Sequence, residues 1–221
     1  MFFKSKDLGL FGFLVSRMCA YTHPYTRGGV ITLSLRTRPL ASTNEIAMSD
    51  GPQLLDAIRL HPLELTPRLA YHDWAKEHPD AVHAMIAAVM AVPEFQILTP
   101  HGLGLSRRSG ETSAEREERL RNERILLLTE RDGFSASVAW LATRGTQATV
   151  DAGRDSYGYK HDVECSLPGD HAVYVPNGAF IAAAVHAGFV WKTYWASPNV
   201  RFGISRRPLR ARSRDEQRTS R

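Results

Sequence analysis

A stretch of small and apolar residues, "NGAFIAAAVHAG" from Asn177 to Gly188, constrains the fold more than any other feature of this chain. Asparagine side chains accept from exposed helix N–H groups and glycine adopts the left-handed backbone that closes a helix, so Asn177 should cap this helix and Gly188 should end it. Its bulkier apolar residues recur at helical spacing: Phe180, Ile181, Ala184 and Val185. Alanines fill much of the remaining surface, so we expect a helix packed between layers. It offers almost no Arg, Lys, Asn or Gln with which to read base edges.

The segments around this helix predict the fold class. Asp155 or Ser156 should cap a preceding helix, and two strands, "FVWKTYW" at 189–195 and "VRFGIS" at 200–205, follow with the turn "ASPN" between them. We therefore expect a mainly α fold with a small C-terminal β-hairpin, in the α+β class. The order helix, helix, hairpin is also that of the last elements of a winged-helix domain, so a winged-helix-like C-terminal end is the alternative.

Helices also dominate the prediction for the middle of the chain. Thr66 followed by Pro67 is a typical helix opening, and this helix should continue until Pro79. A second helix over 80–92 should pair with it as a helical hairpin, and "EFQIL" at 94–98 should form a short strand.

A capping box marks the next helix. Thr112 and Glu115 have the spacing at which each side chain accepts from the other residue's backbone N–H, so we expect a helix over 113–131. Basic and acidic residues are equally numerous along it, which favours a solvated helix with many ion pairs over a nucleic-acid contact. Gly133 should interrupt the chain before a short buried helix over 135–143.

Length and composition predict one domain with an extension at each end. The chain has 221 residues, of which 43% are hydrophobic, enough to bury a core. We expect residues 1–47 to be a disordered or mis-annotated extension, with translation starting at Met1 or at Met48. Residues 48–205 should form a single helical domain with the C-terminal hairpin, and residues 206–221 should be a disordered, Arg-rich tail.

Cysteine content and hydropathy bear on the setting of the protein. Cys19 and Cys165 are the only cysteines, so no disulfide framework or paired metal knuckle is expected, and a reducing, cytoplasmic setting is favoured. No apolar run approaches the roughly 20 residues that a membrane-spanning helix needs. We therefore expect no membrane span.

The net charge of +5 is unevenly distributed. Residues 201–221 hold eight arginines against two acidic residues, and residues 1–40 hold six basic residues against one, whereas residues 41–200 hold 14 basic and 20 acidic residues. Basic ends on an acidic body give at most a short-range, salt-sensitive attraction for polyanions. The candidate nucleic-acid contacts therefore lie in the hairpin and the tail: Lys192, Arg201, Arg206, Arg207, Arg210 and Arg212.

A polar stripe on the helix "SYGYKHDVEC" is the strongest candidate for a catalytic site. At about 100° per residue, the members of this polar stripe share one helix face: Tyr157, Lys160, His161 and Glu164. Histidine titrates near neutral pH and a glutamate can orient it, so these side chains could bind an anion or move protons. The alternative is a solvated face on which Lys160 and Glu164 form an ordinary exposed pair.

No cofactor or metal is expected. His161, Cys165 and His171 would supply three zinc ligands, but a structural zinc site needs a fourth, which the sequence does not indicate. The chain also lacks the HExxH and P-loop patterns.

Three segments of the last third, "SYGYKHDVE", "YVPNGAFIAAAVHAGF" and "SPNVRFGIS", resemble uncharacterised proteins of bacterial phages and mobile elements. No activity is attached to that group. The resemblance therefore implies an accessory protein of a replicating or transferring element, and it assigns no catalytic residue.

Three functions follow from these observations. The first is a non-enzymatic accessory protein that associates weakly with nucleic acid through its basic tail and through Lys192 and Arg201. The second is a protein-interaction or inhibitor module that uses the acidic body, including Asp162 and Glu164. The third is a small enzyme built on the polar stripe, which requires a pocket beside that face. The absence of a catalytic motif favours the non-enzymatic functions.

Overall fold

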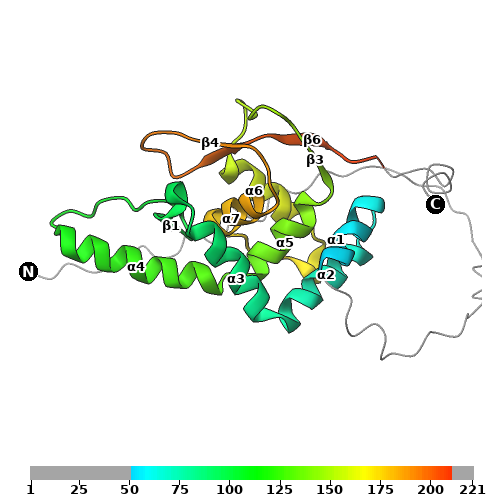
Figure 1. The fold of residues 1–221 in the computed structure, drawn as a ribbon, viewed down its shortest axis with the longest axis horizontal. Helices are drawn as coiled ribbons and strands as arrows, with labels where there is room; N and C mark the ends of the chain where they lie inside the picture. Colours follow the sequence, from blue (N-terminus) through cyan, green and yellow to red (C-terminus); the bar gives the residue numbers. More distant parts are fainter. Residues whose placement is uncertain (1–50, 211–221) are drawn as a thin grey trace, which may run out of the picture. The chain divides into compact units, whose positions relative to one another are not determined.

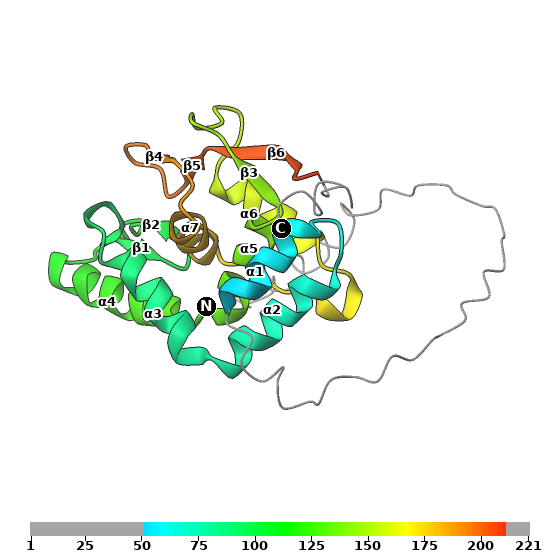
Figure 2. The same cartoon turned by 45° about the vertical axis from the view of Figure 1, so that its right-hand side comes forward.

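The helix predicted from Asn177 is buried along almost its whole length. The computed structural model describes residues 51–210 (Figure 1), in which α7 (Asn177–His186) is buried from its first residue to Ala184. Helices α3 (Pro79–Met90), α5 (Arg131–Leu141) and α6 (Ser156–Cys165) pack against it, and the two ribbon views agree on this arrangement (Figures 1 and 2). The predicted position between layers is confirmed.

A close approach of two backbones fixes the start of α7. A Cβ on Gly178 would lie 1.8 Å from the Thr99 carbonyl oxygen, so only glycine lets α7 reach the strand β1 (Leu98–Thr99). The Gly178 N–H donates to the Pro100 carbonyl at 3.0 Å. β1 pairs with β2 (Gly102–Leu103), which also packs against α7.

The helix α2 (Thr66–Glu77) packs on α5, and it does not form the predicted hairpin with α3. α1 (Gly51–Leu60) packs against α2. Only His78 separates α2 from α3, and antiparallel helices need a longer connection, so the predicted helical hairpin of these two helices is wrong. Thr66 was expected to cap α2, but Leu65 occupies the cap position.

Two short segments of the chain form 3₁₀ turns. Pro93–Phe95 forms the turn η3, because the proline ring fixes the φ of a first helical turn. The strand predicted over 94–98 is therefore wrong except at Leu98. A second turn, η4 (Gly169–His171), lies in the connection between α6 and α7.

The capping box of the charged helix is confirmed. α4 (Ser113–Thr129) begins after Thr112, whose Oγ1 accepts from the Glu115 N–H at 3.3 Å, while the Glu115 carboxylate accepts from the Thr112 N–H at 2.8 Å. Arg124 holds α4 beside α3 because its guanidinium donates to the carbonyl oxygens of Gln96 and Phe95 that follow α3.

Gly133 lies inside α5 and does not precede it, which corrects the predicted interruption. A Cβ on Gly133 would lie 2.8 Å from the Pro176 Cδ, so the glycine admits the segment that leads into α7. The residue is therefore required by packing, and the helix continues through it.

The C-terminal strands form two antiparallel pairs. β4 (Trp191–Thr193) pairs with β5 (Val200–Phe202) as the predicted hairpin. β6 (Ile204–Pro208) pairs with β3 (Arg144–Thr146), a partner that the sequence did not indicate. The mainly helical α+β class is confirmed. A winged-helix domain presents an exposed recognition helix, and α7 has no such face.

The predicted start of the C-terminal tail is wrong, because Arg206 and Arg207 lie within β6. Residues 1–47, Met48 and Arg212 lie outside the described residues. Among residues 51–210, no helix combines the length and the apolar character that crossing a membrane requires.

Candidate nucleic-acid interface

The β4–β5 hairpin has one face in the core. Val200 and Phe202 are completely buried, and Trp191 meets the ring of Phe95 edge-on with 4.9 Å between centroids. Alternate residues of a strand point to opposite faces, so the residues between these anchors face outward. The hairpin thus presents a second, outer face that is fixed by the packing of the first.

The outer face carries two of the predicted nucleic-acid contacts. Lys192 and Arg201 are paired directly across the two strands. The Arg201 guanidinium lies 4.6 Å from the centroid of the Tyr194 ring, and the Lys192 Nζ lies 5.6 Å from the same centroid. The structure therefore gathers two cations around one aromatic ring, a combination that suits both phosphates and bases.

The tip of the hairpin exposes a tryptophan. Trp195 is 99% exposed, and the next residue, Ala196, has a φ of 58° in the left-handed region. Large aromatic side chains are normally well buried, and leaving one in water forgoes about 1.5–3 kcal/mol of burial. A fully exposed indole next to a residue with unusual backbone geometry is a candidate contact residue.

A partly buried hydrogen-bond network fixes the hairpin loop to the body. The Asn177 Nδ2 donates to the Asn199 Oδ1 at 2.9 Å, and the Asn199 Nδ2 donates to the Asp155 Oδ2 at 2.8 Å. The Pro198 carbonyl accepts from the Leu103 N–H at 2.8 Å. Asn177 was expected to cap α7, but Pro176 occupies the cap position. The Asn177 side chain hydrogen-bonds to the hairpin loop instead. The loop that carries Trp195 is therefore anchored.

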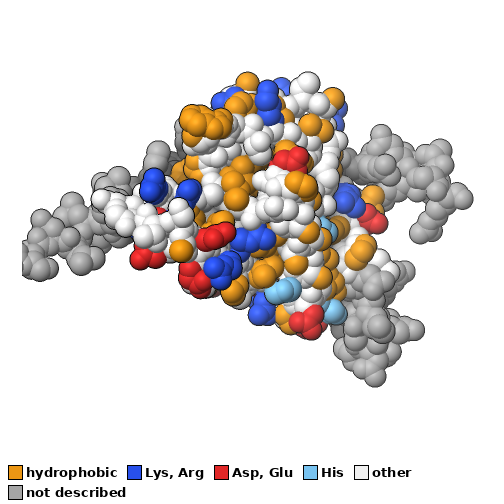
Figure 3. Space-filling model, turned by 60° about the vertical axis from the view of Figure 1, so that its left-hand side comes forward, with side chains coloured by type: hydrophobic (Ala, Val, Ile, Leu, Met, Phe, Trp, Pro, Cys, Tyr) orange, Lys and Arg blue, Asp and Glu red, His pale blue; other side chains and the backbone are white. Residues whose placement is uncertain are grey.

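An open groove of about 1000 Å³ separates this loop from the start of α4. We call it the hairpin groove. It is lined by Glu94, Ile97, His101, residues 103–108, Arg116, Arg119, Glu123 and residues 193–198. Figure 3 brings forward the side of the molecule where α4 begins, and shows basic, acidic and hydrophobic side chains interspersed on it.

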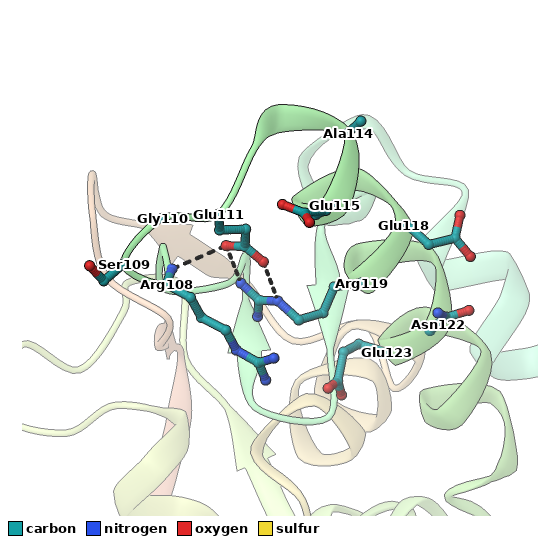
Figure 4. Close-up of a pocket in the computed structure, with 10 residues that line it drawn as sticks. All are labelled: Arg108, Ser109, Gly110, Glu111, Ala114, Glu115, Glu118, Arg119, Asn122 and Glu123. Carbon is teal, nitrogen blue, oxygen red and sulfur yellow. Dashed lines mark hydrogen bonds and ion pairs between the residues drawn. The ribbon is translucent and has the colours of Figure 1, made fainter.

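Some charged side chains of the hairpin groove are already bonded to other groups of the protein. Arg119 forms a bidentate pair with Glu111, at 2.7 and 2.8 Å (Figure 4). This hydrogen bonding, with a further bond from the Arg108 N–H, lowers the pKa of Glu111 to about 2. Arg116 donates to the Leu105 carbonyl at 2.9 Å. The exposed guanidiniums of Arg107 and Arg108 have no carboxylate within ion-pair distance among the described residues, so they remain available to an anion.

The other predicted nucleic-acid contacts lie away from the hairpin loop. β6 leads in the opposite direction from that loop in both ribbon views (Figures 1 and 2). Arg206 binds Asp151 through two hydrogen bonds, at 2.7 and 3.0 Å, which with the Gly153 N–H lower the pKa of Asp151 to about 2. Arg207 and Arg210 are exposed. The structure therefore separates the basic hairpin from the basic C-terminal end.

The polar stripe is only partly the solvated face that was the alternative to a site, because Tyr157 and His161 are exposed whereas Lys160 is not. Lys160 is only 3% exposed, and its Nζ lies between two tyrosine rings, 5.2 Å from the centroid of Tyr157 and 4.9 Å from that of Tyr174. The expected exposed pair of Lys160 and Glu164 is instead a partly buried contact of 3.0 Å. The Tyr174 ring is supplied by the connection to α7, which a pattern on one helix cannot reveal.

Glu164 is the centre of this cluster. It accepts from the Lys160 Nζ at 3.0 Å, from the Val175 N–H at 3.0 Å and from the His161 Nδ1 at 2.7 Å. Burial raises its pKa, but these three donors together outweigh burial and lower the pKa below its usual range. None of the four members of the polar stripe lines the hairpin groove. The bond between the Val175 N–H and Glu164 joins α6 to the segment that leads into α7.

Sequence reasoning missed the aromatic and arginine components of the hairpin groove. Tyr194 and Trp195 were expected within a strand, and Arg107 and Arg108 were not among the candidate contacts. A signal was present, because two aromatic residues preceded the turn of a predicted hairpin with basic residues on both strands. The approach of the arginines depends on how the segment before α4 folds back, which no local pattern shows.

No protein-family model, curated protein or solved structure matches this chain. The resemblance to phage and mobile-element proteins therefore stays a prediction. Among residues 51–210, no three His, Cys, Asp or Glu side chains are placed to hold a metal ion.

Proposed function

We propose that this protein binds single-stranded nucleic acid without catalysis, with the hairpin groove as its contact surface. The observation that carries the proposal is the anchored, fully exposed Trp195 on a groove that the unpaired Arg107 and Arg108 also line. The wider role, an accessory protein of a phage or mobile element, rests on the resemblance and remains part of the proposal.

Base stacking would supply the first part of the affinity. Stacking of a nucleic-acid base on an aromatic side chain contributes about 1–3 kcal/mol and tolerates any sequence, because every base has a flat face. Trp195 offers such a surface at the edge of the hairpin groove, and Tyr194 lines the groove beside it. A base inside a duplex is already stacked, so this surface favours single strands.

Phosphate contacts would supply the second part. Lys192 and Arg201 lie on the hairpin, and Arg107 and Arg108 lie across the hairpin groove. Each phosphate neutralised by a basic side chain releases a counterion, so the affinity should fall as salt rises. The groove also holds Glu94 and Glu123, which limits its positive charge and fits a weak association.

The basic C-terminal end would add a separate, non-specific attraction. Arg207 and Arg210 are exposed near the end of the described residues, and further arginines follow in the sequence. Because β6 leads away from the hairpin loop, a strand bound in the hairpin groove would reach these residues only if it followed the protein surface. Deleting residues 209–221 should therefore lower the affinity while leaving the dependence on Trp195 intact.

A fluorescence-anisotropy assay with labelled single-stranded oligothymidylate tests the proposal. Trp195→Ala should weaken binding roughly 5- to 100-fold, the equivalent of one lost stack, while Trp195→Phe keeps most of the affinity. Leu63→Ala is the matched control, because Leu63 is 77% exposed and does not line the hairpin groove. Equal affinity of wild type and Trp195→Ala, or tighter binding of duplex than of single strand, would overturn the proposal.

The two other functions gain less support. Asp162 is paired with Arg154, and Glu164 is engaged by three internal donors, so neither carboxylate is available to a partner in the way a protein-interaction surface needs. An enzyme on the polar stripe would need substrate to reach Lys160, which is buried between tyrosines.

A further inference from the structure

A cavity of about 320 Å³ lies between α2, α5 and the connection from α6 to α7. We call it the α2 cavity. Charged residues of both signs line it: Arg68, Asp73, Lys76, Asp132 and Asp170. It shares no lining residue with the hairpin groove. Its volume is at the lower end of the range for sites that bind small molecules.

The charges of the α2 cavity are only partly neutralised by one another. The Lys76 Nζ lies 3.7 Å from the Asp73 Oδ1, whereas Asp170 has no cation within ion-pair distance among the described residues. Arg68 has no carboxylate partner either, because its guanidinium donates only to the Ser166 Oγ at 2.7 Å and to the Ser166 carbonyl at 3.4 Å. A cation and a carboxylate of one cavity are therefore left without a charged partner.

The hydrogen bonds of Arg68 are also incomplete. Its Nε is buried and has no acceptor. A cation whose only partners are neutral oxygens, with one N–H unsatisfied, is unfavourable in a partly buried position. A carboxylate that entered the α2 cavity would supply the charged partner that the fold does not provide.

His72 presents a hydrogen-bond acceptor to the same cavity. The Ser135 Oγ donates its only hydrogen to the Asp132 carbonyl at 3.2 Å, so it accepts from the His72 Nδ1 at 2.9 Å, and Nδ1 carries the ring hydrogen. Burial, with the nearby charge of Lys76, lowers the pKa of His72 below its usual value. The ring is therefore neutral at pH 7, and its Nε2 has a free lone pair.

The His72 Nε2 and the Asp132 Oδ1 form a pair of acceptors. They lie 3.9 Å apart, and neither atom has a hydrogen to donate to the other. An ammonium group has three N–H donors, so one such group beside both atoms can donate to each of them. The side chain of Asp132 is 65% exposed and that of His72 is 15% exposed, so a ligand can reach this acceptor pair from solvent.

An apolar wall completes the α2 cavity. It consists of Leu69, Ala136, Ala139, Leu167 and Val173. The two alanines of α5 are small, which leaves space for an apolar group of a ligand. Contact with this wall would remove apolar surface of the ligand from water.

We propose that the α2 cavity binds a free α-amino acid with an apolar side chain. The ligand carboxylate would bind Arg68, and the ligand ammonium would donate to the His72 Nε2 and to Asp132. Arg68 and His72 are four residues apart on one face of α2, with about 5–6 Å between their Cβ atoms, so one small molecule can contact both. A ligand with only a negative charge is disfavoured, because the aspartates of the cavity repel it.

Isothermal titration of the full chain with L-leucine and two analogues tests the proposal. 4-Methylpentanoate has the leucine skeleton without the ammonium group, and 3-methylbutylamine has it without the carboxylate. Wild type should bind leucine at one site and each analogue at least 10-fold more weakly, because a charge-assisted contact is lost. An analogue that binds as tightly as leucine, or the lack of saturable binding for leucine and valine alike, would overturn the proposal.

Variants of the two charged contacts give the second test. Arg68→Gln should abolish leucine binding, and Asp132→Asn should weaken it roughly 10-fold. Arg59→Gln and Asp80→Asn are the matched controls, because both residues are exposed and neither lines the α2 cavity. Should Arg68→Gln fail to fold, Arg68→Lys keeps the charge with fewer donors and should weaken leucine binding severalfold. Unchanged leucine affinity in the folded Arg68 variant would overturn the site.

The outcomes separate this proposal from the proposed function. Trp195→Ala should bind leucine as wild type does, because Trp195 does not line the α2 cavity. Arg68→Gln should bind oligothymidylate as wild type does, because Arg68 does not line the hairpin groove. A wild-type protein that binds leucine but not oligothymidylate would refute the proposed function alone. Loss of leucine binding in Trp195→Ala would overturn the separate amino-acid site.

Discussion

Lys192 and Arg201 stand directly opposite each other on β4 and β5, as two cations paired across a ribbon whose other face lies in the core. Like charges at such positions destabilise a two-stranded pair. Neither residue has a carboxylate within ion-pair distance among the described residues. Repulsion between the two cations lowers the stability of the free protein. A bound anion would offset this repulsion.

Replacing either cation by threonine should weaken nucleic-acid binding without lowering the stability of the fold. Lys192→Thr or Arg201→Thr should leave the free energy of unfolding unchanged or raise it by up to about 1 kcal/mol, because the cross-strand repulsion is removed. Each should lower the salt dependence of oligothymidylate binding by about one counterion. Urea unfolding and binding across salt concentrations measure the two quantities. Lys76→Thr, an exposed lysine on α2, should change neither, and an unchanged salt dependence in the hairpin variants would contradict the phosphate contacts.

Asn177 should matter for the hairpin loop more than for the helix that it begins. Asn177→Ala removes the donor to the Asn199 Oδ1 and should lower the free energy of unfolding by about 1–3 kcal/mol. Amide hydrogen exchange should show the loss of protection in β4 and β5 before α7. Asn122→Ala, an exposed asparagine on α4, should stay within about 0.5 kcal/mol of wild type. A loss of protection confined to α7 would show that Asn177 acts as a cap after all.

Glu164 should make the fold sensitive to acid. Its pKa lies below the ordinary value of 4.5, so its contribution to stability is fully present above about pH 4.5 and is lost as the pH falls through the lowered pKa. Glu164→Gln should be less stable than wild type at pH 7, and the difference should shrink as the solution is acidified from pH 5 to about pH 3. Thermal unfolding across that range measures it. Two curves that stay parallel down to pH 3 would rule out this carboxylate as the source.

Gly178 should tolerate no side chain. Gly178→Ala places a Cβ against the Thr99 carbonyl oxygen at 1.8 Å, so we expect the free energy of unfolding to fall by about 3 kcal/mol or more. At Gly145, by contrast, the nearest atom to a new Cβ is 3.6 Å away, an ordinary contact. Gly145→Ala is therefore the control and should cost about 1 kcal/mol at most. Comparable stability of both variants in chemical denaturation would contradict the close approach of α7 and β1.

Features within one element were predictable from the sequence. The apolar period of α7 predicted its burial, the spacing of Thr112 and Glu115 predicted the start of α4, and the turn at 196–199 between two strand-like segments predicted the hairpin. Features that depend on a distant partner were not. Gly133 resembles a helix breaker until Pro176 is placed against it, and Arg206 resembles tail sequence until β3 pairs with β6.

The candidate sites divide in the same way. Lys192 and Arg201 were predictable because both belong to one hairpin, which the structure brings into register. Lys160 was predicted to be on a polar face, but Tyr174 from a different segment covers it.

The central claim is that Trp195 stacks on the bases of a single strand, and the most direct measurement compares an oligothymidylate with an abasic strand of the same length. Wild type should bind the strand with bases roughly 5- to 100-fold more tightly, and Trp195→Ala should bind the two strands almost equally. A wild-type protein that binds both strands with the same affinity, or a Trp195→Ala variant that keeps the full preference, would contradict the claim.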